Sequence, residues 1–173
     1  MSMAERLVVI GGDAAGMTAA TNARRGQTDL DIVVLEKGRY TSYSACGIPY
    51  LIGGAVDELE DLVVRTPQEF RDKHRIDARI NHEVMGIDLD RRTVEVRAHD
   101  HDRTITMGFD LLHIATGARP TRPDLVGMDA PWIRGVQTLT DAADLLARVE
   151  AGECGRVVVV GGGYVGLEMA EAF

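Results

Sequence analysis

The sequence is poor in cysteine, with only Cys46 and Cys154 among its 173 residues. Two cysteines so far apart argue against a framework of structural disulfides and favour reduced thiols in a reducing compartment. Long apolar runs are also lacking near the N-terminus, where the run from Leu7 to Ile10 is too short for a signal peptide or a membrane span. We therefore predict a cytoplasmic protein with no membrane partner.

Positive charge is scarce as well. The chain has 19 lysine and arginine residues against 27 aspartate and glutamate residues, which gives a net charge of -8 and a pI near 5.1. The basic residues form short pairs, Arg24-Arg25 and Arg91-Arg92, and no basic stripe is present that could neutralise nucleic-acid phosphates. A hydrophobic content of 45% with mixed charges is typical of a soluble globular domain, and it excludes disorder and collagen.

The first part of the chain outlines the start of a dinucleotide-binding βαβ unit. We predict a strand from Arg6 to Ile10, the turn Gly11-Gly12-Asp13-Ala14-Ala15-Gly16, a small-residue helix from about Ala14 to Arg25, and a strand from Asp31 to Leu35. Glu36 follows that strand, where an acidic side chain is expected on a ribose hydroxyl; an ordinary strand-end carboxylate is the alternative. Asp13 stands where glycine normally lets the backbone approach a pyrophosphate. Its carboxylate could turn away, or lie near the helix N-terminus, where the dipole favours negative charge.

The middle of the chain changes its periodicity. Thr66-Pro67-Gln68-Glu69 predicts a capping box with proline at the first helical position, followed by a short helix from Gln68 to His74. Between Ile76 and Phe109 the hydrophobic period becomes two, which predicts a small antiparallel meander. We then predict a buried strand over residues 110–115 and a helix over residues 141–150.

The last residues repeat the opening pattern. An apolar strand from Arg156 to Val160 runs into a second turn, in which Gly161, Gly163 and Gly166 fit G-x-G-x-x-G. The chain reaches its last residue inside the helix expected to follow, so we predict the beginning of a second nucleotide-binding unit. The strand end that separates NAD from NADP binding lies beyond it, and this choice stays open.

Cys46 stands in the run Ser42-Tyr43-Ser44-Ala45-Cys46-Gly47-Ile48-Pro49-Tyr50, ten residues beyond Glu36. A proline so placed is tolerated if a helix begins around residues 45 to 48. Free backbone amides and the positive end of the helix dipole would then favour the thiolate, the reactive form for disulfide exchange or sulfenic acid formation. A buried structural cysteine is the alternative. Cys154 is expected in a loop.

Two further groups are open to more than one interpretation. Thr18, Asn22 and Arg25 are spaced by four and three residues, so they share one helical face, which is either a binding face or a solvated surface. The run His99-Asp100-His101-Asp102 has alternating ligand-like side chains, but it lies in a predicted hairpin turn with no third ligand nearby. We therefore predict no metal site.

Taken in order, these motifs resemble those of the flavin-dependent pyridine nucleotide disulfide oxidoreductases. The motifs are Gly11 to Gly16, Glu36-Lys37, Ser42-x-x-x-Cys46-Gly47-x-Pro49-Tyr50, Ala115-Thr116-Gly117 and Gly161-x-Gly163-x-x-Gly166-x-Glu168. The resemblance covers essentially the whole chain. Within the family, the chain is similar to the single-cysteine branch, which contains coenzyme A disulfide reductase, NADH oxidase, NADH peroxidase and the CoA-persulfide reductases.

The resemblance implies an α/β fold in two parts. Residues 1–150 would form a Rossmann-like FAD-binding domain, a parallel sheet with helices plus the small meander, and residues 151–173 the truncated beginning of an NAD(P)-binding domain. FAD and NADH or NADPH would be the cofactors. The residues implied in cofactor binding are Gly11, Gly12, Asp13, Ala14, Ala15, Gly16, Glu36, Lys37, Val84, Ala115, Thr116, Gly117, Gly161, Gly163 and Gly166.

The resemblance also implies a reaction. Hydride would pass from the nicotinamide to FAD, the reduced flavin would cleave a mixed disulfide at Cys46, and the thiolate would attack the next disulfide or persulfide, with coenzyme A disulfide as the expected substrate. In CoA disulfide reductases, coenzyme A contacts the positions that match Thr18, Asn22, Arg25 and Ser42. Two positions differ, because Ala45 replaces an asparagine common before the cysteine, and an expected lysine aligns with His74.

Two alternatives stay open. Cys46 could be a sulfenic acid centre that reduces oxygen or peroxide, as in an NADH oxidase or peroxidase. The chain as given could also be a non-catalytic flavin-binding fragment, since the nicotinamide half is missing; we expect these 173 residues alone to be inactive. The full-length protein is expected to be a homodimer.

Overall fold

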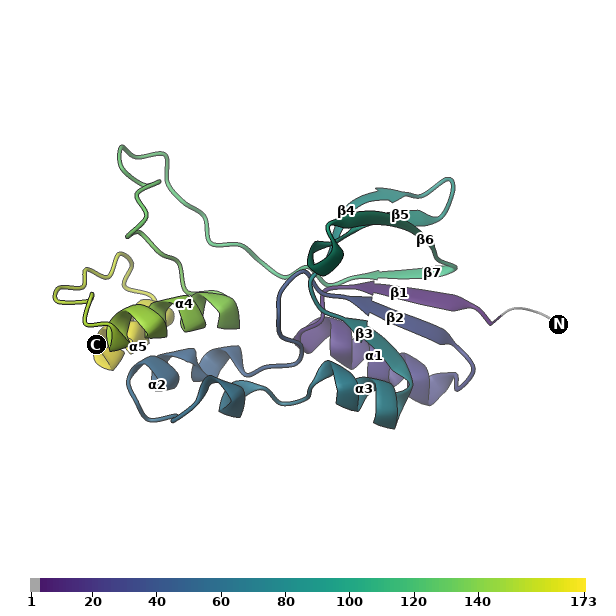
Figure 1. Cartoon of the computed structure of the whole chain (residues 1–173), viewed down its shortest axis with the longest axis horizontal. Coiled ribbons are helices and arrows are strands. Elements are labelled where there is room, and N and C mark those ends of the chain that lie inside the picture. The colour runs from purple at the N-terminus through teal and green to yellow at the C-terminus, as the bar shows by residue number, and fades with distance from the viewer. Residues whose placement is uncertain (1–3) are drawn as a thin grey trace. The chain divides into compact units, whose positions relative to one another are not determined.

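A computed structural model describes residues 4–173 (Figure 1). The chain divides into two compact units, which are described separately below. The described part of the first unit is residues 4–43 and 64–117, and the second unit is residues 44–63 and 118–173. The chain therefore leaves the first unit after Tyr43, returns at Val64 and leaves again after Gly117. The division into domains at residues 150 and 151 stays a prediction.

The first unit is built on a four-stranded parallel sheet in the order β3-β2-β1-β7 (Figure 1). Strands β1 (Arg6–Ile10) and β2 (Asp31–Leu35) have the predicted bounds, and β7 (Leu111–Ile114) lies within the predicted range. In the centre of the sheet, Val8 of β1 is opposite Val33 of β2 and Leu112 of β7. The predicted parallel sheet of a Rossmann-like domain is confirmed.

The fourth strand of this sheet, β3 (Ile76–Arg79), was not predicted as a separate strand; it lies at the start of the range in which the hydrophobic period becomes two. It is the edge strand of the parallel sheet, with Ile76 opposite Ile32 of β2. Ile76 and Ala78 are buried, whereas Asp77 and Arg79 are partly exposed. Because only one face of this edge strand carries apolar side chains, its sequence alternates as an antiparallel strand does.

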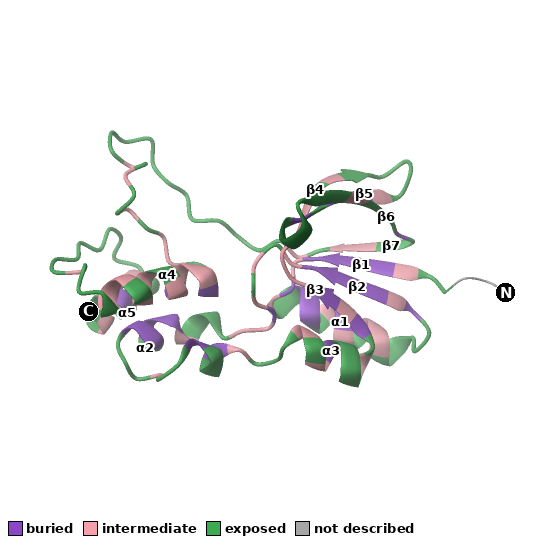
Figure 2. Ribbon diagram, in the orientation of Figure 1, coloured by how far each residue is buried: buried purple, intermediate pink, exposed green. Residues whose placement is uncertain are grey.

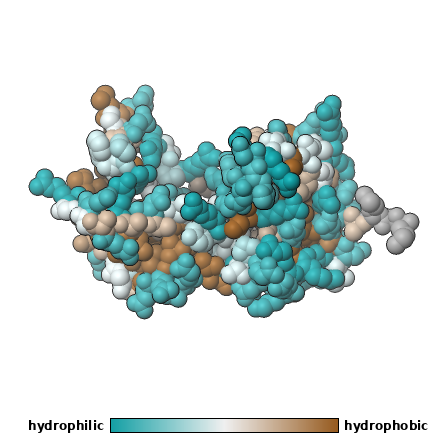
Figure 3. Space-filling view, viewed as in Figure 1, coloured by the Kyte–Doolittle hydropathy of each residue, from teal (hydrophilic) through white to brown (hydrophobic). Residues whose placement is uncertain are grey.

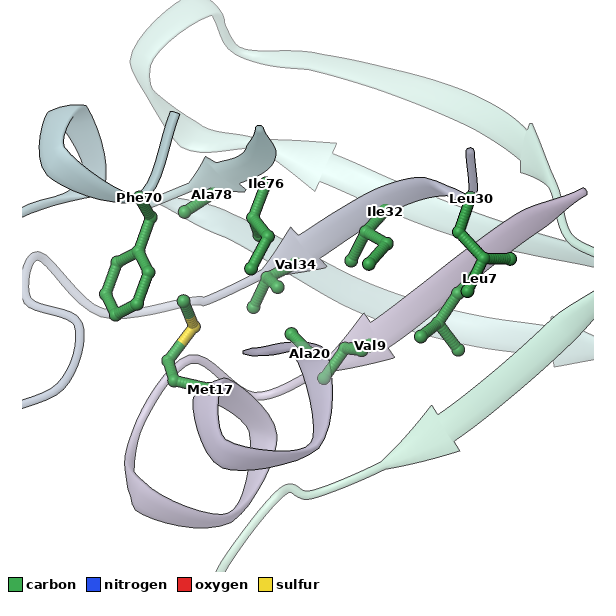
Figure 4. Packing of buried hydrophobic residues seen from close by; sticks show 10 residues of the cluster. All are labelled: Leu7, Val9, Met17, Ala20, Leu30, Ile32, Val34, Phe70, Ile76 and Ala78. Carbon is green, nitrogen blue, oxygen red and sulfur yellow. The ribbon is translucent and has the colours of Figure 1, made fainter. Parts of the chain in front are cut away.

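Helices α1 (Ala14–Gly26) and α3 (Pro67–His74) cover one face of this sheet (Figure 1). Figure 4 shows Met17 and Ala20 of α1 and Phe70 of α3 packed against strand side chains. The predicted capping box of α3 is confirmed, since Glu69 N donates to Thr66 Oγ1 at 3.2 Å and Thr66 N donates to Glu69 Oε2 at 3.0 Å. The strand residues of this cluster are Leu7, Val9, Ile32, Val34, Ile76 and Ala78.

The predicted meander covers the opposite face. It consists of β4 (His82–Asp88), β5 (Thr93–Ala98) and β6 (Arg103–Gly108), paired antiparallel in that order. The strands that Figure 2 colours purple, β1 and β2, are therefore covered on both faces of the sheet. The second core cluster contains Val8, Ile10, Val33, Leu35, Val94, Val96, Met107 and Phe109. The run His99–His101 forms a short 3-10 turn (η3) between β5 and β6, at the predicted hairpin.

The second unit is helical. It contains η1 (Ala45–Gly47), α2 (Ile48–Ile52), η2 (Leu59–Leu62), α4 (Leu139–Glu150) and α5 (Tyr164–Ala172), and α2 contacts both α4 and α5. Helix α4 begins two residues before the predicted start. The reason is a capping box, in which Asp141 N donates to Thr138 Oγ1 and Thr138 N donates to Asp141 Oδ2.

Residues 156–160 are not assigned to a strand, although the sequence predicts one. A strand requires ladder hydrogen bonds to a neighbour, and within residues 4–173 no strand pairs with this run. Val158 and Val160 are 78% and 93% exposed. Figure 3 shows apolar surface on the visible face of the second unit. Tyr50 and Trp132 of this unit are also exposed. No helix of the described chain is long and apolar enough to cross a membrane.

Candidate functional site

The first glycine turn lies where β1 and β7 end, the edge of an open parallel sheet at which ligands bind. Gly11 has a φ of +104°, and a Cβ at this position would lie 2.2 Å from the carbonyl oxygen of Ala115. A Cβ on Gly16 would lie 1.9 Å from the carbonyl oxygen of Gly11. A side chain is therefore excluded at the first glycine by the segment after β7, and at the third by the packing of α1 against the turn.

The second turn repeats this geometry within the second unit. Gly161 has a φ of +115°, and a Cβ on Gly166 would lie 2.1 Å from the carbonyl oxygen of Gly161. Gly163 is the N-cap of α5, as Asp13 is the N-cap of α1. A Cβ on Gly163 would meet nothing within 4 Å, so the backbone there is open to a ligand. The predicted repeat of the turn is confirmed at the level of its backbone.

The carboxylate of Glu36 lies against the first turn. Its Oε2 accepts from Gly12 N and its Oε1 from Gly38 N, each at 2.7 Å. Its backbone joins the neighbouring strands, because Glu36 N donates to the carbonyl of Arg79 and His82 N donates to the carbonyl of Glu36. The structure thus brings together the turn and the acidic residue that the sequence predicts as its partner. Lys37 is exposed beside them.

Asp13 turns toward another part of the chain. Its side chain makes no capping hydrogen bond with α1; instead, Oδ1 accepts from Tyr43 N at 3.2 Å. Burial raises the pKa of Asp13, the backbone N–H groups of Tyr43 and Ala14 act in the opposite direction, and the negative charge of Glu36 adds to the rise. A half-buried carboxylate therefore occupies the second glycine position of the motif.

Residues 41–43 lie against the first turn. Ser42 is a predicted site residue, but the contacts of this segment with the turn were not predicted. Thr41 is buried, and its Cγ2 would be 3.1 Å from a Cβ on Gly12. Ser42 has a φ of +50°, and its N–H donates to the carbonyl of Gly12 at 3.0 Å. Contacts between residues so far apart in the chain leave no local pattern in the sequence.

The other residues of the first unit lie at the expected elements. The chain continues β7 past Ala115, whose N–H donates to the carbonyl of Ile10 at 2.7 Å, and Gly117 follows with a φ of +67°. Thr116 is exposed, and Val84 of β4 is partly buried against the second core cluster. On α1, the predicted substrate face is exposed, and Arg25 Nη1 donates to Asn22 Oδ1 at 3.5 Å. Its residues are Thr18, Asn22 and Arg25.

Cys46 belongs to the second unit and is exposed in η1, immediately before α2. Gly47 N donates to the carbonyl of Ser44 at 2.9 Å, and Ser44 N donates to the carbonyl of Leu62 at 2.8 Å. A Cβ on Gly47 would lie 2.3 Å from Leu62 Cδ2, so this glycine lets the turn pack on η2. The thiol is exposed among the described residues, and the predicted helix start is confirmed. Cys154 lies in a loop.

The first unit also has an open cavity of about 440 Å³ between the start of α3 and the connection from β3 to β4. Thr66, Arg71, Arg79 and His82 are among its lining residues. None of the predicted site residues lines it, although Arg79 and His82 exchange backbone hydrogen bonds with Glu36. Among residues 4–173, no cluster of three or more His, Cys, Asp or Glu side chains could hold a metal ion.

Comparison with known proteins gives a consistent result. Residues 5–173 match the family described as "Pyridine nucleotide-disulphide oxidoreductase". The NADH oxidase of Methanocaldococcus jannaschii is 37% identical over 166 residues, which cover 95% of this chain and 37% of that protein. The coenzyme A disulfide reductase of Staphylococcus aureus (strain COL) is 32% identical over 166 residues, which cover 96% of this chain and 37% of that protein.

Solved structures agree with these relatives. The reduced Bacillus anthracis CoADR-RHD is similar with a TM-score of 0.94 at 29% identity, over 98% of this chain and 30% of that one. An NAD-dependent persulfide reductase from A. fulgidus is similar with a TM-score of 0.87 at 36% identity, over 96% of this chain and 31% of that one. The chain thus spans little more than a third of the length of the curated relatives it matches.

Proposed function

The chain belongs to the pyridine nucleotide-disulphide oxidoreductase family, and from this premise we propose that its full-length protein is an FAD-dependent NAD(P)H oxidoreductase that reduces a low-molecular-weight disulfide or persulfide through Cys46. Coenzyme A disulfide is the proposed substrate. The observation that carries the proposal is an exposed thiol on the turn before α2, three residues beyond a segment that is hydrogen-bonded to the dinucleotide turn. Three residues of chain span at most about 11 Å.

The residues at the first turn fit FAD, which when bound supplies electron transfer between a nicotinamide and a thiol. Gly11 and Gly16 allow the tight turn, and the start of α1 offers backbone N–H groups and the positive end of its dipole to a pyrophosphate. A carboxylate has about four acceptor sites, and Glu36 accepts here from Gly12 N and Gly38 N. Its remaining capacity suits ribose hydroxyls.

The other cofactor contacts are proposed on the same basis. Val84 would lie beside the adenine, and Ala115, Thr116 and Gly117 would pass close to the flavin half. Gly161, Gly163 and Gly166 would hold NADH or NADPH, because the open backbone at Gly163 leaves room for a pyrophosphate.

Cys46 would carry the exchange chemistry. Its thiolate attacks one sulfur of the substrate disulfide, a mixed disulfide forms, and the displaced thiolate takes up a proton. FAD and NAD(P)H, when bound, would supply the two electrons for this reduction. Cleavage of the mixed disulfide would then release the second thiol, which takes up a proton, and restore the thiolate of Cys46. One disulfide, one NAD(P)H and one proton thus give two thiols and one oxidised nicotinamide.

The exposed face of α1 supports coenzyme A as the substrate. Thr18, Asn22 and Arg25 lie on it, and a guanidinium such as that of Arg25 suits the phosphates of a nucleotide-linked thiol. Ser42 would join them. The relatives include the coenzyme A disulfide reductase of Staphylococcus aureus and, at 34% identity, an NAD(P)H coenzyme A polysulfide/persulfide reductase of Pyrococcus horikoshii. The family's expected lysine aligns with His74. The adjacent Lys73 forms an ion pair with Glu69 at 2.8 Å.

The test is the Cys46→Ser variant of the full-length protein. We expect it to lose NAD(P)H-dependent reduction of coenzyme A disulfide while it keeps FAD, measured by nicotinamide oxidation and by the flavin absorbance. Cys154→Ser is the matched control and should keep full turnover. Retained turnover in Cys46→Ser would refute the proposal.

An oxidase or peroxidase is the second candidate, favoured by the similarity to an NADH oxidase. Cys46 would then cycle through a sulfenic acid. Oxygen uptake or peroxide consumption that exceeds disulfide turnover in the full-length protein would select it. The domain division, the homodimer, the cytoplasmic location and the inactivity of residues 1–173 alone are proposed with the function. Activity and oligomer measurements on both lengths of chain test the inactivity and the homodimer.

A further inference from the structure

We propose that Asp13 is a positioning residue for Cys46: its carboxylate holds the backbone of Tyr43 against the first glycine turn, and so fixes the point from which the cysteine segment begins. This inference rests on the proposed redox role of Cys46. It assigns a purpose to the one side chain that departs from the glycine pattern of the turn.

The turn itself does not need this side chain. The second turn has the same positive φ at its first glycine and the same close approach at its last, but it has Gly163 where the first turn has Asp13. Both residues are N-caps with extended backbone, which any residue adopts. A carboxylate at this position therefore serves something other than the formation of the turn.

The hydrogen bonds between residues 42–43 and the first turn indicate the role of this carboxylate. Ser42 N donates to the carbonyl of Gly12 at 3.0 Å, and Tyr43 N donates to Asp13 Oδ1 at 3.2 Å, so two successive N–H groups are bound by two successive residues of the turn. On its other side, the carbonyl of Ser42 accepts from Val64 N at 2.8 Å. Asp13 supplies the only side-chain acceptor among these three bonds, and it binds the residue nearest to Cys46.

The environment of Asp13 is unfavourable for a charged carboxylate. Asp13 is half-buried, and the carboxylate of Glu36 raises its electrostatic cost. The groups that offset this cost are the N–H of Tyr43 and the N–H of Ala14. The proposed role rests on the hydrogen bond from Tyr43 N to Asp13 Oδ1, which the amide oxygen of an asparagine could also accept.

The experiment uses the full-length protein with FAD bound and Cys46 reduced. The variants are Asp13→Ala, which removes the acceptor, Asp13→Asn, which keeps an acceptor oxygen, and Asp110→Asn. Asp110 is a matched control, because its carboxylate also accepts from a backbone N–H, that of Arg6 at 2.7 Å, before β7 rather than after β1. The readouts are amide hydrogen exchange of residues 41–46 and the rate of Cys46 alkylation by iodoacetamide between pH 6 and 9.

We expect Asp13→Ala to speed the exchange of residues 41–46 and to change the Cys46 alkylation rate by about fivefold, the factor that one hydrogen bond is worth. Asp13→Asn should stay within about twofold of the wild type, because its amide oxygen still accepts from Tyr43 N. If Asp13→Ala does not retain FAD, Asp13→Gly takes its place, since glycine is the residue at the corresponding position of the second turn.

Unchanged exchange and unchanged alkylation in the variant that lacks the acceptor would overturn the proposal. An Asp13→Asn variant as strongly altered as Asp13→Ala would overturn it too, because charge and not the hydrogen bond would then be the cause. Failure of the proposed function is seen separately, as retained disulfide turnover in Cys46→Ser, on which neither readout depends.

Discussion

At Gly16, the first glycine turn has no room for even one methyl group. A Cβ on Gly16 would meet the carbonyl oxygen of Gly11 at 1.9 Å, so Gly16→Ala must displace either α1 or the turn. We expect a loss of about 3 kcal/mol in the free energy of unfolding, with loss of bound FAD. Gly26→Ala, at the end of the same helix with open space around it, should instead stabilise the protein by about 0.5–1 kcal/mol. Urea unfolding of both full-length variants provides the comparison.

The raised pKa of Asp13 makes its effect on stability depend on pH. Because its folded-state pKa lies above the unfolded value, the charged form is disfavoured by folding, and the cost is complete only above the folded pKa. Asp13→Asn should therefore raise the free energy of unfolding at pH 7, and this gain should disappear as the pH falls below the ordinary range of aspartate. A gain that persists at low pH would contradict this account.

The residues of the site were predictable to different degrees. The glycines, Glu36 and Cys46 follow from spacing, since a turn, a strand end and a helix start each impose a local pattern. The partnership of Asp13 with Tyr43 and the burial of Thr41 did not follow, because they depend on which distant segment packs beside the turn. Sequence reasoning found the unfavourable carboxylate but could not identify the N–H group that binds it.

Among the elements, α1 and α3 are joined at their C-terminal ends by Arg24. Its guanidinium donates to the carbonyls of His74, Arg75 and Thr28 at 3.1, 2.8 and 2.9 Å. Arg24→Ala should cost about 1–2 kcal/mol, because these bonds are partly exposed to solvent. The adjacent Arg25 lies on the proposed substrate face, so Arg25→Ala should leave stability nearly unchanged and raise the KM for coenzyme A disulfide. Thermal unfolding measures the stability loss of Arg24→Ala, and steady-state kinetics measure the KM of Arg25→Ala. An equal loss of stability in both variants would contradict these predictions.

At the N-terminus of α3, the contribution of Glu69 to the stability of the fold depends on pH. The hydrogen bond from Lys73, then the backbone N–H of Thr66, lower the pKa of Glu69 to about 2. A folded pKa below the unfolded value means that Glu69 stabilises the fold above its ordinary pKa, and that this contribution is lost as the pH falls toward about 2. The stability difference between the wild type and Glu69→Gln should be larger at pH 6 than at pH 3. Lys73→Ala should shrink that pH dependence, and an unchanged dependence would argue against Lys73 as its main cause.

Elements with a complete local pattern were predicted closely. β1 and β2 have the predicted bounds because continuous apolar runs end in turns, and α3 was identified by its capping box. β3 was not recognised as a strand of the parallel sheet, because an edge strand covered on one face alternates like a meander strand. The start of α4 was missed although Thr138-x-x-Asp141 is itself a capping pattern.

At the scale of the whole molecule, the apolar run Val157–Val160 is exposed in the described residues. The run precedes a glycine turn with the geometry of the turn after β1, yet it has no strand partner within the described residues. We expect its amides to exchange hydrogen as slowly as those of β1 in the full-length protein, because a valine run of this kind is stable as a strand only when neighbours pair with it. Fast exchange there would contradict a second nucleotide-binding unit built on this strand.

The hydrogen bond from Val64 N to the carbonyl of Ser42, at 2.8 Å, closes the excursion of residues 44–63 at its base. The chain leaves and re-enters the first unit at one point, so this segment can change in length or content without shifting the register of any strand in that unit. Residues 44–63 therefore form an insertion between two fixed points of the first unit. Replacement of residues 44–63 would change the segment that carries Cys46 while the strands of the first unit keep their pairing.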